Sequence, residues 1–204
     1  MRPLLLAAAA VASLALAPVA EAAITIKANG VTVASDPTNL NATFVGAVGG
    51  FNINVINSAG VNAFAGNGTL MENASVNIAT AGTGTLTLEL IQTDLSLPGA
   101  TAEFSALFTG LITNAAVSRA FYIDTANTGA AATLLGATAV GNESFSTAVA
   151  LSGLFSLTEV ITITANGPGA ALSADDQVRV PEPMSLALLG LGIVGLAAVR
   201  RRAD

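Results

Sequence analysis

The sequence has no cysteine, no histidine and no tryptophan, and its 204 residues include one tyrosine. Without cysteine the chain can form no disulfide and offers no thiol nucleophile or thiolate metal ligand. Without histidine it lacks the usual general base at neutral pH and the commonest ligand for zinc or haem. Charged residues are scarce at 10%, and 7 basic against 13 acidic residues give a net charge of −6. This balance argues against a nucleic-acid-binding surface.

Residues 1–22 are predicted to be a signal peptide for export. Arg2 and the free amine form a short positive region, and an apolar run follows over residues 4–17. Ala20 and Ala22 then give the small-x-small pattern of a cleavage site, which places the cut after Ala22, with a cut after Ala23 as the second choice. A buried N-terminal helix is the alternative, but this run has no polar face and so no amphipathic period.

The end of the chain is predicted to hold a single transmembrane helix. The 16 residues from Met184 to Val199 carry no charge and are followed by Arg200, Arg201 and Arg202. As a helix they reach about 24 Å, somewhat short of a hydrocarbon core of about 30 Å, and arginine snorkelling and bilayer thinning can close that gap. The arginines act as a stop-transfer signal on the cytoplasmic side, so the rest of the chain is expected outside the inner membrane.

A short motif precedes this span, at Val180, Pro181, Glu182 and Pro183. The two prolines keep it extended and separate it from the helix behind, which leaves a strand that a membrane peptidase could grip. Motif, apolar span and arginine cluster together resemble the PEP-CTERM sorting signal of Gram-negative bacteria. The same segment is also known as an ice-binding-protein C-terminal domain, a label that says nothing of what the body binds. The resemblance implies that an exosortase, a membrane-embedded transpeptidase, processes the chain.

The body between the two ends is predicted to be mainly β. Ile24–Ala28 and Val31–Ser35 alternate around Asn29-Gly30, which predicts a hairpin with a type I′ turn. Further strands are expected where apolar and polar residues alternate or β-branched residues concentrate: 51–55, 85–90, 104–108, 119–124, 144–150 and 157–165. Residues 130–139 could form a short helix or a strand.

Seven or eight short strands predict an antiparallel β-sandwich of the jelly-roll or Ig-like kind, with the signal helix before it and the membrane helix behind. A β-helix is the alternative, although no repeat period is visible. The expected organisation is a signal peptide at 1–22, a sandwich domain at 23–164, a Gly/Pro/Ala/Ser-rich linker at 165–180 and the sorting signal at 181–204.

Acidic side chains are the remaining route to catalysis, since paired carboxylates can hydrolyse glycosides. Glu89 and Glu159 both fall in predicted strands and could face each other across strands. The ten acids of the body are nevertheless spread evenly, and the sequence predicts no catalytic, cofactor-binding or metal-binding residue. Asp175-Asp176 could donate oxygens to calcium, but no spaced ladder of acids with a glycine turn surrounds them. Two adjacent acids before a linker are expected to be solvated.

The sequence therefore predicts a non-enzymatic exported protein, anchored in the inner membrane as a precursor and then found at the cell surface or outside. By resemblance, its partners are the exosortase and possible matrix components such as exopolysaccharide, with a structural or interaction role in a biofilm. A glycan- or ice-binding module is the first alternative, and Thr83, Thr85 and Thr87 could then form a flat threonine row. A carboxylate-dependent glycan hydrolase is the second alternative. A cofactor is not expected.

Overall fold

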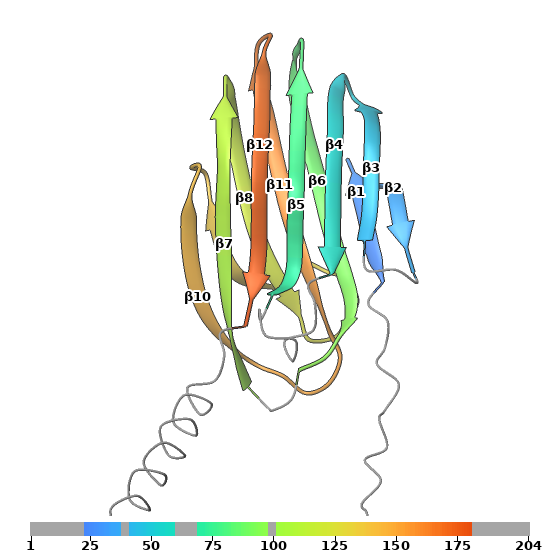
Figure 1. The fold of residues 1–204 in the computed structure, drawn as a ribbon, viewed down its shortest axis with the longest axis vertical. Coiled ribbons are helices and arrows are strands. Elements are labelled where there is room, and N and C mark those ends of the chain that lie inside the picture. The colour runs from blue at the N-terminus through green and yellow to red at the C-terminus, as the bar shows by residue number, and fades with distance from the viewer. Residues whose placement is uncertain (1–22, 38–40, 60–68, 98–100, 181–204) are drawn as a thin grey trace, which may run out of the picture.

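The computed structural model describes residues 23–37, 41–59, 69–97 and 101–180, which form a sandwich of two antiparallel β-sheets (Figure 1). Sheet A has the strand order β2-β1-β6-β11-β8-β9, and sheet B has the order β10-β7-β12-β5-β4-β3. The strands are β1 (Ile24–Ala28), β2 (Val31–Asp36), β3 (Asn41–Val48), β4 (Phe51–Ala59), β5 (Thr69–Thr80), β6 (Thr83–Leu95), β7 (Thr101–Thr113), β8 (Ala115–Asp124), β9 (Thr133–Thr138), β10 (Glu143–Ala150), β11 (Phe155–Asn166) and β12 (Ala170–Arg179). The predicted sandwich is confirmed, and the β-helix alternative is wrong.

The strands form where the sequence alternates, and their apolar positions meet between the sheets. The β1–β2 hairpin turns at Asn29 and Gly30, whose φ values of 50° and 78° are both positive, as a type I′ turn requires. On β4 the side chains of Phe51, Ile53 and Val55 are buried while the asparagines between them are exposed. The same alternation buries the expected face of β6, β7 and β8, so the sandwich core is the one that the sequence predicts.

The region that the sequence left open between helix and strand is β9, at the edge of sheet A. It closes one side of the sandwich against β10 of sheet B. Thr147 Oγ1 on β10 donates a hydrogen bond of 2.9 Å to the carbonyl oxygen of Leu135 on β9. Gly136 lies under Phe145 so closely that a Cβ at this glycine would come within 2.7 Å of the ring.

The predicted linker at 165–180 is wrong. Residues 170–179 form β12, which lies inside sheet B between β7 and β5. Its inward side chains are mostly small: Ala170, Leu172, Ala174, Asp176 and Val178 are all buried. Because alanine and aspartate occupy inward positions where large aliphatic residues are usual, the sequence shows no clear apolar–polar alternation for this strand. The strand is formed because its neighbours supply hydrogen-bonding partners on both sides.

Strand β5 carries a bulge that the sequence did not reveal. Against both β12 and β4, the segment from Asn73 to Val76 contains one residue more than its partner strand. The buried positions therefore change from Met71 and Asn73 before the bulge to Val76 and Ile78 after it. A bulge re-aims side chains in this way, and here it turns Asn73 into the interior.

Strand β1 begins and β12 ends at the same end of the sandwich (Figure 1). Val180 follows β12 directly and packs, partly buried, against the core. The predicted signal peptide, the residues Pro181, Glu182 and Pro183, the apolar span and the arginine cluster lie outside the described residues. Among the residues that the structure describes, no helix is long and apolar enough to cross a membrane.

Candidate functional site

A trough lies on the outer face of sheet B. It has a volume of about 690 Å³ and crosses β3, β4, β5, β12 and β7. We call it the sheet B trough. Its floor consists of two rows of outward side chains that the strand register places side by side: Val45, Asn54, Asn77, Ser173 and Leu111 in one row, and Ala47, Asn52, Ala79, Ala171 and Thr113 in the other.

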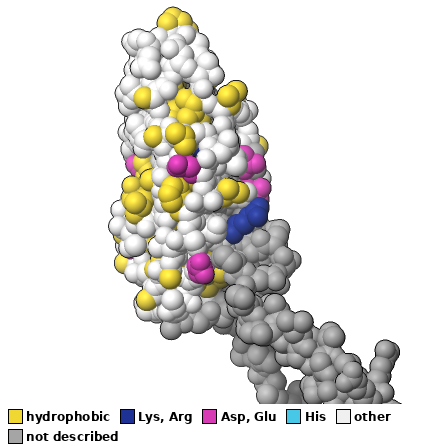
Figure 2. All heavy atoms as spheres, turned by 90° about the vertical axis from the view of Figure 1, so that its left-hand side faces the viewer, with side chains coloured by type: hydrophobic (Ala, Val, Ile, Leu, Met, Phe, Trp, Pro, Cys, Tyr) yellow, Lys and Arg dark blue, Asp and Glu magenta, His cyan; other side chains and the backbone are white. Residues whose placement is uncertain are grey.

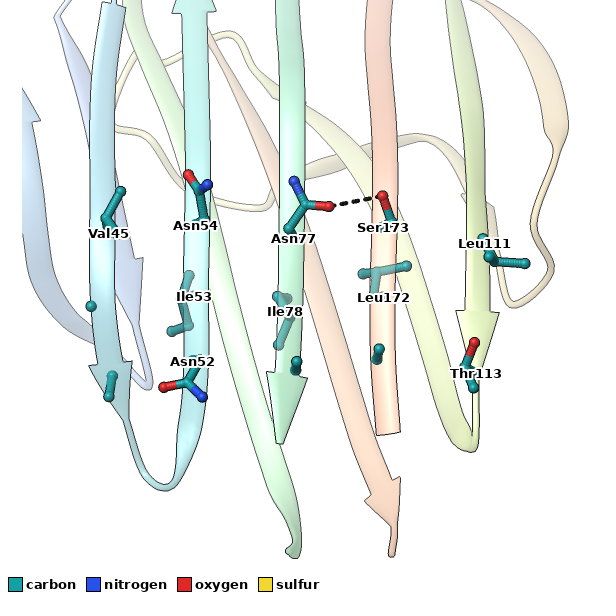
Figure 3. Close-up of a pocket in the computed structure, with 14 residues that line it drawn as sticks. Val45, Asn52, Ile53, Asn54, Asn77, Ile78, Leu111, Thr113, Leu172 and Ser173 are labelled. Carbon is teal, nitrogen blue, oxygen red and sulfur yellow. Dashed lines mark hydrogen bonds between the residues drawn. The ribbon is translucent and has the colours of Figure 1, made fainter. Parts of the chain in front are cut away.

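Figure 3 shows the first row running across sheet B from Val45 to Leu111, with Ile53, Ile78 and Leu172 pointing to the other side of the sheet. Alternation along each strand produces this arrangement, because every second residue of a strand faces the same way. The sequence analysis predicted a strand at 51–55 from its alternation of apolar and polar residues. If Phe51, Ile53 and Val55 face the core, that alternation requires Asn52 and Asn54 to face solvent.

Hydrogen bonds orient part of the trough and leave part of it available. Ser173 Oγ donates to Asn77 Oδ1 at 2.8 Å, and Asn77 Nδ2 donates to Ser75 Oγ at 2.6 Å. The side-chain amides of Asn52 and Asn54 make no hydrogen bond to other described residues. Val45 and Leu111 flank the polar centre and are 71% and 70% exposed. The lining residues carry no charge, so the trough offers neutral donors and acceptors between two apolar rims.

The outer face of sheet A is less open. The predicted threonine row lies there, with Thr83 and Thr85 exposed and Thr85 Oγ1 3.2 Å from Thr164 Oγ1. The segment after β8 folds over the other half of this face. Thr158 Oγ1 donates to the carbonyl oxygen of Gly129 at 3.1 Å, and the amide of Gly129 donates to Ser156 Oγ at 3.0 Å. Sheet B therefore presents the larger free face. Seen from the side on which β10 lies, the surface between the sheets carries few charged groups (Figure 2).

Polar side chains also gather inside the sandwich, and the sequence analysis missed them. Arg119 on β8 and Glu159 on β11 point inward from sheet A, and Asp176 on β12 and Asn73 on β5 point inward from sheet B. All four are fully buried. Arg119 Nη1 donates to Asp176 Oδ1 at 2.6 Å and to the carbonyl oxygen of Thr109 at 3.0 Å. We call these four residues the buried polar cluster.

Arg119 ties three parts of the fold together. Its Nη2 donates to the carbonyl oxygens of Val140 and Gly141, both at 2.8 Å, in the turn between β9 and β10. Its guanidinium carbon lies 5.4 Å from the centre of the Phe108 ring, a cation–π contact. Buried charges are expected to be paired and hydrogen-bonded in this way, because an isolated one would cost many kcal/mol.

Burial and a neighbouring carboxylate favour the protonated form of Glu159. Burial and the Asp176 carboxylate raise its pKa well above the ordinary value of 4.5. Burial also raises the pKa of Asp176, but the hydrogen bond from Glu159 and the Arg119 guanidinium act against that rise. Glu159 Oε1 and Asp176 Oδ2 have no hydrogen-bond partner among the described residues, and a proton held between the two carboxyl groups would satisfy both. Asn73 Nδ2 donates to the remaining oxygen, Glu159 Oε2.

The structure excludes one pairing that the sequence left possible and overturns one expectation about these acids. Glu89 and Glu159 do not face each other, because Glu89 is opposite Val160 in the register and so points to the outer face, where it pairs with Lys27 at 3.7 Å. Asp176 is not a solvated residue before a linker, since it is fully buried in the sheet B centre. The facing pair is Glu159 and Asp176. Neither side chain is exposed, so no glycan can reach this pair in the described fold.

Metal binding gains no support from the described part of the chain, where no group of three acidic side chains could hold an ion. Asp176 is already committed to Arg119 and to the backbone amide of Thr109. Asp124 uses its carboxylate to close a turn, accepting hydrogen bonds from Thr128 and from the amide of Ala126, and these bonds lower its pKa.

The end of the chain is matched by a family model, the PEP-CTERM protein-sorting motif, at residues 179–202. The chain therefore carries a PEP-CTERM sorting motif, as the sequence predicts, and this motif indicates an exported protein that is anchored in the membrane and sorted to the surface. The matched segment begins at Arg179, the last residue of β12. No curated protein matches the chain.

Among solved structures, the chain is similar to TmCBM61 in complex with beta-1,4-galactotriose, at 13% identity and a TM-score of 0.33, covering 62% of this chain and 80% of that one. It is also similar to the enzymatically active domain of bacteriophage CBA120 tailspike protein 4, at 15% identity and a TM-score of 0.30, covering 69% of this chain and 19% of that one. At such TM-scores neither likeness bears on function.

Proposed function

We propose that this chain is a surface or extracellular-matrix protein whose sandwich body contacts a neutral polysaccharide through the sheet B trough after an exosortase has processed its tail. The observation that carries the binding part is the trough itself: two five-residue rows of uncharged side chains on an exposed sheet face. Exposed asparagines in such rows, here Asn52, Asn54 and Asn77, are the feature expected of a glycan-binding module. The two carboxylate pairs considered above give an enzymatic role no support, because Glu89 and Glu159 point to opposite faces of sheet A and the pair of Glu159 with Asp176 is buried.

The chemistry of the trough favours a neutral glycan. Free amides such as Asn52 and Asn54 can donate to and accept from sugar hydroxyls, and the aliphatic rims at Val45 and Leu111 can cover the apolar faces of sugar rings. A net charge of −6 repels acidic polysaccharides. The trough has no aromatic lining residue, so affinity per site is expected to be modest and to depend on many contacts along a polymer.

The position of the trough suits a surface protein. The sorting motif continues from the end of β12, whereas the trough occupies the opposite half of the same strand, at Ala171 and Ser173. Seven residue-to-residue steps separate Ser173 from Val180, and at 3.3 Å per step they span about 23 Å. The trough would therefore lie at a distance from the membrane while the precursor is still anchored.

Sorting is tested by the intact mass and cell fraction of the native protein in its source bacterium, with and without the exosortase. The expected result is a surface or medium form that lacks the residues after about Pro183 and disappears in the strain without the enzyme. A full-length form in the membrane of both strains would show that the tail is an anchor only.

Glycan binding is tested by affinity electrophoresis in gels that contain neutral or acidic polysaccharides, including the exopolysaccharide of the source bacterium. A double variant, Asn52→Ala with Asn54→Ala, is expected to weaken retardation in a neutral polysaccharide about tenfold, as the loss of hydrogen bonds of about 0.5–1.5 kcal/mol each predicts. Ser118→Ala on the exposed outer face of sheet A is the matched control and should bind as the parent chain does. Equal retardation of all three proteins, or retardation by acidic polymers alone, would reject the trough as the binding site.

A further inference from the structure

Each sheet of the sandwich ends in two edge strands, and the four edges differ in how they are protected. The edges of sheet A are the six-residue strands β2 and β9, and each pairs with its neighbour through a register shift. Bulges, charges and prolines are the usual means by which proteins prevent an edge strand from pairing with another chain. Both edges of sheet A carry such a bulge or irregularity.

Strand β3 of sheet B has none of these protections. It contains eight residues without charge or proline, and its register with β4 runs unbroken from Asn41 opposite Ser58 to Val48 opposite Phe51. Its other edge pairs with no described strand. The remaining edge, β10, is also unbroken but begins with the exposed Glu143. Among the described edges, β3 is therefore the one best suited to accept a further strand.

We infer that β3 pairs with β3 of a second copy of this chain, antiparallel and around a two-fold axis at Val45. A two-fold interface must be self-complementary, since the same surface meets itself. Pairing around Val45 satisfies this condition position by position. Thr43 would lie opposite Ala47 of the other copy, Phe44 opposite Gly46, and Ala42 opposite Val48. In each of these off-axis pairs the larger side chain meets a smaller one.

The exposure of β3 agrees with this arrangement. Val45 is 71% exposed, the highest value among the exposed large hydrophobic side chains of the described surface. On the axis it would lie against its own counterpart. Phe44 is half-buried, and its ring leans over Gly46 of its own strand, within 2.7 Å of where a Cβ would stand. The pairing brings the two half-buried rings together on the core side of the sheet, where both lose contact with water.

The dimer also extends the sheet B trough. Val45 ends the row that runs through Asn54, Asn77 and Ser173 to Leu111. Joining two copies at Val45 makes one continuous row across both sheets, twice the length offered by one chain. The assembly is independent of what the trough binds, and its test uses no ligand.

Cysteine cross-linking tests the pairing, since the chain has no native cysteine. Three single variants of the full chain in mild detergent, Val45→Cys, Thr43→Cys and Ser146→Cys, are oxidised with copper–phenanthroline and separated on a non-reducing gel. Two copies of residue 45 meet on the axis, whereas the two copies of residue 43 lie about 14 Å apart, beyond the reach of a disulfide. Residue 146 lies on β10, so Ser146→Cys tests pairing through the other edge of sheet B. The expected yield of dimer for Val45→Cys is at least tenfold that of the other two.

Equal yields from all three variants, no dimer from Val45→Cys, or dimer mainly from Ser146→Cys would each overturn the inference. Sedimentation velocity gives a second test without cysteine. Thr43→Lys places a charge on the exposed side of β3, outside the trough, and should convert a dimer of the parent chain into a monomer. Ser118→Lys adds the same charge to an exposed position of sheet A away from its edges and should leave the dimer intact. A dimer that survives Thr43→Lys, or a monomeric parent chain, would contradict the pairing.

Discussion

Glu159 and Asp176 lie against each other inside the sandwich, and each belongs to a different sheet. Together with Arg119 they join β8, β11 and β12 by polar contacts. These contacts lie in the interior of the sandwich, among side chains that are otherwise mostly hydrophobic. A buried ion pair is weak evidence for stability, but the removal of one member leaves an uncompensated charge. The cluster therefore yields two predictions that ordinary surface charges do not.

The free energy of unfolding of the protein is expected to fall as the pH rises above about 5. The pKa of Glu159 is raised in the folded state, so the folded protein holds a proton that the unfolded chain gives up near its ordinary value of 4.5. That contribution is complete below the unfolded pKa and is lost as the pH rises through the folded pKa. Urea unfolding at a series of pH values measures the effect.

Glu159→Gln is the matched variant for this prediction. Its amide can still donate to Asp176 and its carbonyl oxygen can still accept from Asn73, but it does not titrate. The variant should show little change in the free energy of unfolding over the same pH range. A parent chain with a flat or rising profile between pH 5 and 9 would show that the proton is not held at Glu159.

Removal of Arg119 is expected to destabilise the fold by about 3–5 kcal/mol, because it leaves Asp176 buried and unpaired. Arg119→Met keeps much of the side-chain volume, and its effect is measured as the change in the free energy of unfolding. Lys27→Met removes a cation from the exposed pair with Glu89, where the 3.7 Å contact lies at the surface and is expected to be worth about 0–1 kcal/mol. Similar losses from the two variants would contradict the structural role of the buried polar cluster.

Gly136 is expected to tolerate no side chain. The Cβ of alanine would lie within 2.7–2.8 Å of three atoms of Phe145, and overpacking of this kind costs about 1–3 kcal/mol. Thermal or urea unfolding of Gly136→Ala measures the loss, and Phe145→Leu in the same chain should recover part of it. Gly82→Ala is the control, since no atom lies within 4 Å of a Cβ there. An unchanged stability of Gly136→Ala would mean that β9 and β10 are farther apart than described.

Truncation of the chain tests whether residues 165–180 are a dispensable linker or include a strand that the fold needs. A chain of residues 23–180 is expected to fold, whereas residues 23–165 should not, because β5 and β7 would then lose the strand that lies between them. Far-UV circular dichroism and resistance to protease compare the two. A folded 23–165 chain would restore the linker interpretation and would place the sorting motif at a distance from the body.

The hairpin at Asn29-Gly30 and the inward faces of β4, β6, β7 and β8 were predictable from the sequence. In each case large apolar residues alternate with polar ones, and one local pattern decides both the element and its buried face. The PEP-CTERM motif was equally local, since its parts follow one another in a single segment. Strands β3, β5 and β12 were not found, because small residues, asparagines or a bulge blur their alternation.

Arg119 and Glu159 illustrate the same limit from another side. Arg119 lies on the same face of its strand as the buried Phe121 and Ile123, and Glu159 lies on the same face as the buried Leu157 and Ile161. The sequence thus contained the signal that both would face the core. A charged residue on an inward position is usually excluded there, and only a partner on another strand makes it acceptable. No local pattern reveals that Asp176, 57 residues after Arg119, is that partner.

The sequence by itself determined the PEP-CTERM sorting motif, the β class and most of the apolar core, because these depend on hydrophobic period and on contiguous motifs. The tertiary structure decided which strands pair, which acid meets which cation, and that the outward asparagines of separate strands form one trough. Those features depend on contacts between residues far apart in the chain. Their energies arise only when the two sheets close over each other and exclude water.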